Sequence, residues 1–122
     1  MPHRITDRAT FAALARARRV RRGPLSVAVV PPAGELPPTG RPPARVAYSV
    51  GRKVGVAVVR NRVRRRLRAA CRELEALLVP GAAYLVSAGP AAAGARYRDL
   101  LAHLGEALDA LSRPATRTGA PR

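Results

Sequence analysis

The sequence is short of aromatic residues, cysteine and long apolar runs, and each shortage excludes a class of protein. It holds no Trp, one Phe and three Tyr, too few rings for a surface that stacks several bases. The single cysteine, Cys71, can form neither an intrachain disulfide nor a zinc cluster. No run of about 18 apolar residues is present, and the Arg-rich first 20 residues lack the apolar core of a signal peptide. We therefore expect no membrane segment and a cytoplasmic location.

Acidic residues are also scarce, which leaves the chain strongly positive. Seven Asp or Glu stand against 23 Lys or Arg, giving a formal net charge of +16. The carboxylates form no cluster able to hold two catalytic metal ions. The two histidines, His3 and His103, lie far apart in the sequence, so a shared site for them is not expected. No catalytic residue and no metal ligand is therefore predicted on this chain.

What is present is enough apolar material for one folded domain. The length of 122 residues suits a single domain, and 48% hydrophobic residues are too many for a disordered basic tail. A compact domain at this charge is destabilised by self-repulsion, so a polyanionic partner is expected, with nucleic acid as the first candidate. Residues 45–73 alone carry a net charge of +9, whereas residues 74–122 carry only +1.

Apolar periodicity and turn residues predict seven elements in one domain over residues 1–112. The predicted order is a helix from a cap at Thr6 or Asp7 to about residue 17, strands at 18–22, 25–30 and 45–50, a helix at 57–78, a strand at 82–88 and a helix at 95–111. A Pro-rich loop at 31–44 and a basic turn at 51–55 join the elements, and residues 113–122 form a disordered basic tail. The fold class is an α/β or α+β sandwich with helices on a small sheet.

The predicted helix at 57–78 separates apolar and cationic residues onto opposite faces. Its apolar arc consists of Val63, Leu67, Ala70, Cys71, Leu74, Leu77 and Leu78, so Cys71 is interpreted as a small buried side chain. The opposite face holds Asn61, Arg65, Arg68 and Arg72, flanked by Arg62, Arg64 and Arg66. Seven arginines precede the first acid of this helix, Glu73, whereas a merely solvated face usually mixes both charges.

This nearly all-Arg face suits RNA phosphates better than a DNA base code. A helix that reads DNA bases usually mixes Arg with Asn, Gln, Ser or Thr, and Asn61 is the one such residue here. A helix-turn-helix protein is also disfavoured because a strand precedes this helix. A ribosomal or other structural RNA-binding protein without an enzymatic role remains an alternative.

Residues 45–68, RVAYSVGRKVGVAVVRNRVRRRLR, resemble the signature of the bacterial ribonuclease P protein subunit. That family has a strand, a basic turn of the Lys-Lys-x-Gly type, and a helix that carries Arg-Asn-Arg followed by further basic residues. The matching positions are Arg52, Lys53, Gly55, Ala57, Val58, Arg60, Asn61, Arg62, Arg65 and Arg68. The resemblance covers roughly residues 5–112.

The resemblance implies a ribosomal-protein-like α-β-β-β-α-β-α sandwich whose β-α-β crossover is left-handed, against the general right-handed rule. It also implies an endoribonuclease holoenzyme that removes the 5′ leader from precursor tRNA, with the chemistry carried by a catalytic RNA and by magnesium bound mainly to that RNA. Neither DNA nor a membrane is an expected partner. The residues that would contact the RNA are Arg52, Lys53, Arg60, Asn61, Arg62, Arg64, Arg65, Arg66 and Arg68.

The family also binds the leader in a cleft between the first helix and the sheet. Phe11 matches one aromatic position of that cleft, although it is equally interpretable as a core residue. Ala15 and Ala28 stand where the family often has further aromatic residues, so weaker stacking of the leader is expected. Val56 replaces a common Asn before the Arg-rich helix, which removes a helix cap.

Overall fold

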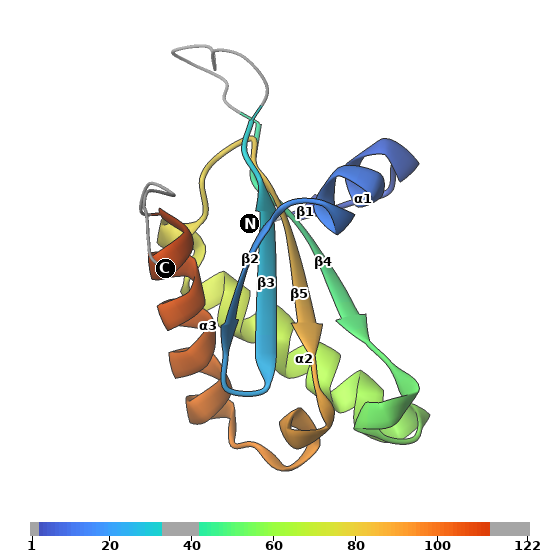
Figure 1. Cartoon of the computed structure of the whole chain (residues 1–122). Helices are drawn as coiled ribbons and strands as arrows, with labels where there is room; N and C mark the ends of the chain where they lie inside the picture. The colour runs from blue at the N-terminus through green and yellow to red at the C-terminus, as the bar shows by residue number, and fades with distance from the viewer. Residues whose placement is uncertain (1–2, 33–41, 113–122) are drawn as a thin grey trace, which may run out of the picture.

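The computed structural model describes residues 3–32 and 42–112 (Figure 1). Its helices are α1 (Arg8–Ala15), α2 (Ala57–Glu73) and α3 (Tyr97–Ser112), and its strands are β1 (His3–Arg4), β2 (Arg18–Arg22), β3 (Leu25–Val30), β4 (Arg45–Val50) and β5 (Ala83–Ala88). Three short 3-10 turns, η1 (Arg52–Val54), η2 (Glu75–Leu77) and η3 (Pro90–Gly94), connect them. The predicted tail at 113–122 and residues 33–41 of the predicted loop lie outside the described residues.

The strands form one mixed sheet in the order β1-β4-β5-β3-β2. Strand β5 runs antiparallel to β3 and parallel to β4, and α2 connects β4 to β5. In Figure 1, β4 and β5 both point down, β5 lies to the left of β4, and α2 passes behind the sheet. This geometry makes the crossover left-handed, as the family resemblance implied, and it is an exception to the right-handed rule.

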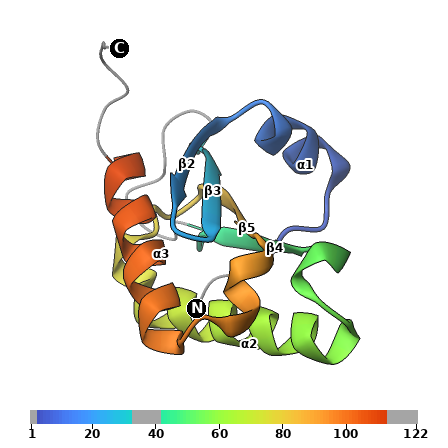
Figure 2. The same ribbon diagram turned by 60° about the horizontal axis from the view of Figure 1, so that its bottom comes forward.

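The two faces of the sheet bury different residues because successive side chains alternate along each strand. On one face, Val27, Val46 and Val86 pack with the buried sides of α2 and α3 in the main core. On the other face, Ala28 and Ala83 pack with Leu14 of α1 in a smaller cluster. Figure 2 shows α1 on the side of the sheet opposite to α2 and α3. Only one end of this second face is therefore covered by a helix.

The predicted elements are present, with one helix clearly shorter than expected. We predicted a helix over 57–78, but α2 ends at Glu73. After Glu73 the backbone tightens: the Leu77 N–H donates to the Leu74 carbonyl at 2.8 Å, and the Leu78 N–H donates to the Glu75 carbonyl at 3.0 Å. The tighter turn places Leu78 in the core and leaves Leu77 41% exposed, so the predicted core position of Leu77 is wrong.

Smaller differences concern the ends of elements. The first helix ends at Ala15 instead of about residue 17, and α3 begins at Tyr97 because Ala95 still closes the 3-10 turn η3. Strand β1 was not predicted, since two residues are too few to show alternation; it pairs in parallel with the start of β4. No helix in the described ranges 3–32 and 42–112 has the length and apolar character needed to cross a membrane.

Gly23 is required by the tight turn between β2 and β3. Its φ is +55°, and a Cβ atom there would lie 2.6 Å from Nε2 of His103 on α3. We expect Gly23→Ala to lower the free energy of unfolding by about 1–3 kcal/mol, measured by urea denaturation, because a left-handed backbone and a steric clash act together.

Two further variants separate these two causes. Gly23→Ala combined with His103→Ala should recover the part of the loss that comes from the clash. Gly51→Ala is the matched control, since nothing lies within 4 Å of its Cβ position and its φ is −85°. An equal loss in Gly51→Ala would show that the turn geometry is not the cause.

Candidate RNA-binding site

Helix α2 is held by one side and exposed on the other. Its buried residues are Val63, Leu67, Ala70 and Cys71, all from the predicted apolar arc. Its exposed residues include Asn61, Arg62, Arg65, Arg68 and Arg72. The predicted separation of the helix into an apolar and a cationic face is therefore confirmed.

Two arginines of α2 also bond to the rest of the fold. Arg64 donates to the Asn61 Oδ1 atom at 3.0 Å and to the Val50 carbonyl at 3.3 Å, at the end of β4. Arg66 donates to the Ala95 carbonyl at 3.0 Å, just before α3. These contacts fix the position of α2 relative to its neighbours, so Arg64 and Arg66 have a structural role that the sequence did not reveal.

Other arginines of α2 point outward without such bonds. Arg62 and Arg65 are exposed and make no hydrogen bond or ion pair within the described residues. Arg68 is exposed as well, and its guanidinium lies over the ring of Tyr48, 5.8 Å from the centroid, in a cation–π arrangement. Arg60 is half-buried, and its Nε has no partner in the part of the chain that the structure describes. Arg62, Arg65 and Arg68 are thus available to an external anion.

The turn η1 extends this cationic surface beyond the start of α2. Arg52 and Lys53 are exposed, whereas Val54 is buried and anchors the turn to the core. Val56 occupies the N-cap of α2 without any side-chain cap, as predicted from its replacement of Asn. The first turn of α2 contains no acidic residue, so nothing in it offsets the positive charge of the neighbouring side chains.

The first acidic residue after this cationic run, Glu73, already has a partner. It accepts a hydrogen bond from the Tyr97 hydroxyl, which ties the end of α2 to the start of α3. Between residues 52 and 72 the chain carries nine basic residues and no acid. We call the exposed residues Arg52, Lys53, Asn61, Arg62, Arg65 and Arg68 the cationic face. Unpaired charge of one sign on a rigid helix is suited to a phosphate backbone.

A hollow of about 210 Å³ lies where α1, β4 and α2 meet. Phe11 lines it and is 42% exposed, which excludes the alternative that Phe11 is a core residue. The second ring in this hollow is Tyr48, with Arg64 and Arg68 beside it. Sequence reasoning treated Tyr48 only as a strand residue, because the contact between β4 and α1 is not visible in the local pattern.

The other two predicted cleft residues do not line this hollow. Ala15 is exposed at the last position of α1. Ala28 is 1% exposed and packs in the smaller core cluster beneath α1, so it has no surface to offer to a ligand. The hollow thus brings Phe11 together with Tyr48 and with Arg68 of the cationic face, whereas Ala15, one helical turn after Phe11, and Ala28 do not line it.

Asp7 anchors α1, the helix that carries Phe11. It caps the helix by accepting a hydrogen bond from the Thr10 N–H at 2.9 Å, and it forms an ion pair with Arg45 of β4 at 2.8 Å. The hydrogen bonds from Thr10, together with that from Arg45, hold the pKa of the Asp7 carboxyl below its usual value, against a smaller opposing effect of burial.

This lowered pKa gives a pH-dependent contribution to stability. A carboxyl with a depressed pKa in the folded state stabilises above its unfolded pKa of about 3.9, and that stabilisation is lost as the pH falls through the folded value. We expect Asp7→Asn to lower the unfolding midpoint at pH 6, with a deficit that shrinks as the pH falls below about 4. Urea midpoints measured from pH 2 to 6 test this, and a deficit that is constant with pH would contradict it.

The described ranges contain no cluster of metal-ligating side chains. No three His, Cys, Asp or Glu side chains of residues 3–32 and 42–112 lie close enough together to hold a metal ion. The lone cysteine, Cys71, is buried, and burial raises its pKa to about 11. The described side chains therefore offer cations and hydroxyls to a ligand but no metal centre.

Comparison with known sequences identifies the family. The sequence model of the ribonuclease P family matches residues 1–112. The ribonuclease P protein component of Thermobifida fusca is 46% identical over 114 residues, which are 92% of this chain and 78% of that protein. The corresponding protein of Nocardioides sp. is 44% identical over 99 residues, covering 80% of this chain and 81% of that protein.

Comparison with solved structures supports the same fold. The RNase P protein of Staphylococcus aureus has a TM-score of 0.70 at 20% identity, over 91% of this chain and 96% of that chain. The RNase P protein of Thermotoga maritima has a TM-score of 0.72 at 17% identity, over 88% of this chain and 96% of that chain. The chain therefore belongs to the family of ribonuclease P protein components, which act in tRNA 5′ processing as part of a ribonucleoprotein, and not to the ribosomal or other structural RNA-binding proteins.

Proposed function

We propose that the cationic face binds the catalytic RNA of ribonuclease P. The observation that carries this proposal is the run of nine basic residues without an acid between 52 and 72. Two of them lie on η1, and seven lie on α2, a helix whose other side is buried. Arg62, Arg65 and Arg68 contact phosphates directly, together with Arg52 and Lys53 of η1. Arg60 and Asn61 complete the contact surface, whereas Arg64 and Arg66 mainly hold α2 in position through their bonds to Val50 and Ala95.

We assign different roles to the protein and to the RNA subunit. In this proposal the protein binds and orients RNA through its exposed cations, and the RNA subunit carries the hydrolysis. When bound, mainly to that RNA, magnesium would supply the chemistry of water activation and of charge stabilisation on the leaving oxygen. Cations on α2 favour the assembled complex because they neutralise phosphates that would otherwise repel one another.

The substrate in this proposal is precursor tRNA, and its single-stranded leader enters the hollow between α1, β4 and α2. Phe11 is half-exposed there and Tyr48 lies beside it, so one leader base can stack against a ring while Arg64 and Arg68 meet the backbone. Asn61 is the one residue of the cationic face, besides its arginines, of a type that reads DNA bases, so DNA is not a partner in this proposal. A membrane is not a proposed partner either. The complex acts in the cytoplasm, which suits a chain whose one cysteine is free.

Phe11→Ala tests the leader contact. Loss of one stacked base should weaken binding of precursor tRNA to the holoenzyme by about 1–3 kcal/mol and leave mature tRNA unaffected. Equilibrium binding of both RNAs measures this. Equal weakening for both would place Phe11 outside the leader site.

The experiment for the whole proposal is reconstitution with the cognate RNase P RNA. Cleavage of precursor tRNA is followed at low magnesium with the RNA alone, with the protein alone and with both. We expect no cleavage by the protein alone and a clear gain when the protein joins the RNA. Absence of any gain would overturn the proposal.

A further inference from the structure

The start of α2 exposes three consecutive apolar side chains. Val56, Ala57 and Val58 are all exposed, and each of the two valines is 71% exposed. No other large apolar side chain of the described ranges is more than 43% exposed. Single apolar residues are common on protein surfaces, whereas a run of three leaves an apolar patch in water. Such a patch is expected where a partner covers it. We call these three residues the valine patch.

The backbone that carries the valine patch is held by the core. Val54 is buried just before the patch, and Val63 is buried one turn further along α2. Val59, the next residue after the patch, packs against the main core. Arg64 donates to the Val50 carbonyl at 3.3 Å and ties this part of α2 to β4. The patch cannot turn inward, because the side of α2 that faces the core is already occupied.

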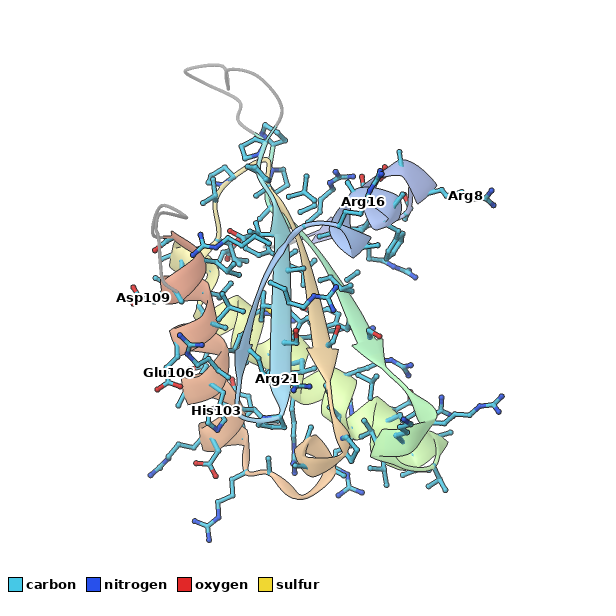
Figure 3. All side chains as sticks on the ribbon, in the orientation of Figure 1. Arg8, Arg16, Arg21, His103, Glu106 and Asp109 are labelled. Atoms are coloured by element: carbon cyan, nitrogen blue, oxygen red, sulfur yellow. The ribbon has the colours of Figure 1, made fainter. Side chains whose placement is uncertain are left out.

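The cationic face flanks the valine patch on both sides along the chain. Two of its members lie on η1, just before the patch. Arg62 and Arg65 follow Val58 by four and seven residues, so these three side chains lie on one side of α2. Figure 3 shows Glu106 and Asp109 on α3, across the molecule from the start of α2. The patch is therefore an apolar area set among positive charges.

An apolar area among cations is complementary to an unpaired nucleobase. In an RNA duplex the base faces are hidden by stacking, and the accessible minor groove displays polar 2′-hydroxyls. A base that is splayed out of a loop or bulge exposes an apolar face next to its own phosphates. Contact with valine methyl groups removes both apolar surfaces from water, while the neighbouring arginines meet the phosphates.

We propose that the valine patch covers an unpaired base of RNase P RNA. The inference rests on the proposed function, in which the cationic face binds that RNA. It adds the kind of RNA structure that the face recognises, which is a loop or bulge in place of a continuous double helix. Val56 stands where the family commonly has Asn, so a polar helix cap is exchanged here for apolar contact with the RNA.

The first test compares Val58→Thr with the unaltered protein in binding RNase P RNA. Threonine keeps the branched shape but places a hydroxyl in the contact, so the affinity should fall about three- to tenfold. The slope of log affinity against log salt should stay the same, since no charge is removed. A change of slope, or an unchanged affinity, would overturn the proposal.

Two further variants control for the chemistry and the place of this change. Val58→Ile keeps the apolar surface and should keep the affinity. Val79→Thr makes the same substitution at an exposed valine beyond the other end of α2, and it should leave the affinity unchanged. Equal weakening by Val79→Thr would show that the effect does not come from the valine patch.

The second test asks which RNA structure meets the patch. Val58→Thr should bind a fully paired RNA duplex as tightly as the unaltered protein does, because a duplex offers no base face. Dimethyl sulfate, which modifies unpaired bases, should leave at least one base of RNase P RNA protected by the unaltered protein at saturation. That base should regain reactivity with Val58→Thr. Equal weakening for the duplex, or identical modification patterns for both proteins, would contradict contact with a base.

The holoenzyme separates RNase P RNA from precursor tRNA as the source of the base. If Val58→Thr weakens binding of precursor tRNA to the assembled holoenzyme but not binding of RNase P RNA to the protein, the assignment to the RNA subunit is wrong. The proposed function fails on a different result, namely no gain in cleavage when the protein joins the RNA. The affinities of Val58→Thr would still decide the role of the valine patch.

Discussion

Replacing Arg62 and Arg65 together by glutamine is expected to weaken binding of RNase P RNA by about tenfold to a hundredfold at low salt. Both side chains are exposed on the cationic face, and neither is bonded within the described residues. Their guanidinium groups can therefore be removed without disturbing the fold. The slope of log affinity against log salt should fall by roughly one unit per lost phosphate contact.

A matched variant separates this local effect from a general loss of charge. Arg22→Gln combined with Arg98→Gln removes two exposed positive charges that lie on β2 and α3 instead of α2. It should leave the affinity for RNase P RNA within about threefold of the original protein, because distant exposed charges are largely screened. If both double variants lose affinity and salt slope equally, the RNA recognises net charge and not this helix face.

Leu67→Ala is expected to lower the free energy of unfolding by about 2–5 kcal/mol. Leu67 is completely buried between α2 and the sheet, so its removal leaves a cavity as well as lost apolar contact. A loss of that size is a large part of the about 5–15 kcal/mol that stabilises an ordinary domain. Urea denaturation monitored by circular dichroism measures it.

Leu77→Ala makes the same chemical change ten positions later at a partly exposed site. Leu77 is 41% exposed, and its replacement should cost less than half as much as that of Leu67. The comparison checks the end of α2 directly, since a helix continuing to residue 78 would bury Leu77 as deeply as Leu67. Equal losses from the two variants would support the longer helix and contradict the structure.

The faces of α2 could be predicted from the sequence because period and charge agree over five turns. Val63, Leu67 and Cys71 recur at helical spacing, and seven arginines lie outside this apolar arc. The end of the helix could not be predicted in this way. Pro80 disfavours a helix at Val79 but not from Leu74 to Leu78. The chain leaves the helix earlier, and tertiary contacts such as the hydrogen bond from the Val79 N–H to the Tyr84 hydroxyl favour the turn.

Features that depend on which segments the fold brings together could not be predicted from the sequence. The roles of Arg64 and Arg66 in fixing α2 depend on the carbonyls of Val50 and Ala95, which only the folded chain brings near. Ser26 of β3 and Ser49 of β4 both pair with Ser87 because β3 and β4 flank β5, an order that no local pattern specifies. The left-handed crossover is a further case, since general packing rules predict the opposite hand and only the family resemblance indicated it.

The cationic face is the centre of this account, and site-directed crosslinking tests it most directly. Cys71 is buried with a pKa raised to about 11, so a cysteine introduced at the surface can be modified selectively. Val58→Cys places a photoreactive group on the exposed side of α2, beside Arg62 and Arg65, and Ala102→Cys places the same group on the exposed side of α3. In the reconstituted holoenzyme we predict crosslinks to RNase P RNA from position 58 and few or none from position 102. Crosslinking from position 102 that equals or exceeds that from position 58 would contradict the assignment of α2 as the surface that binds the RNA.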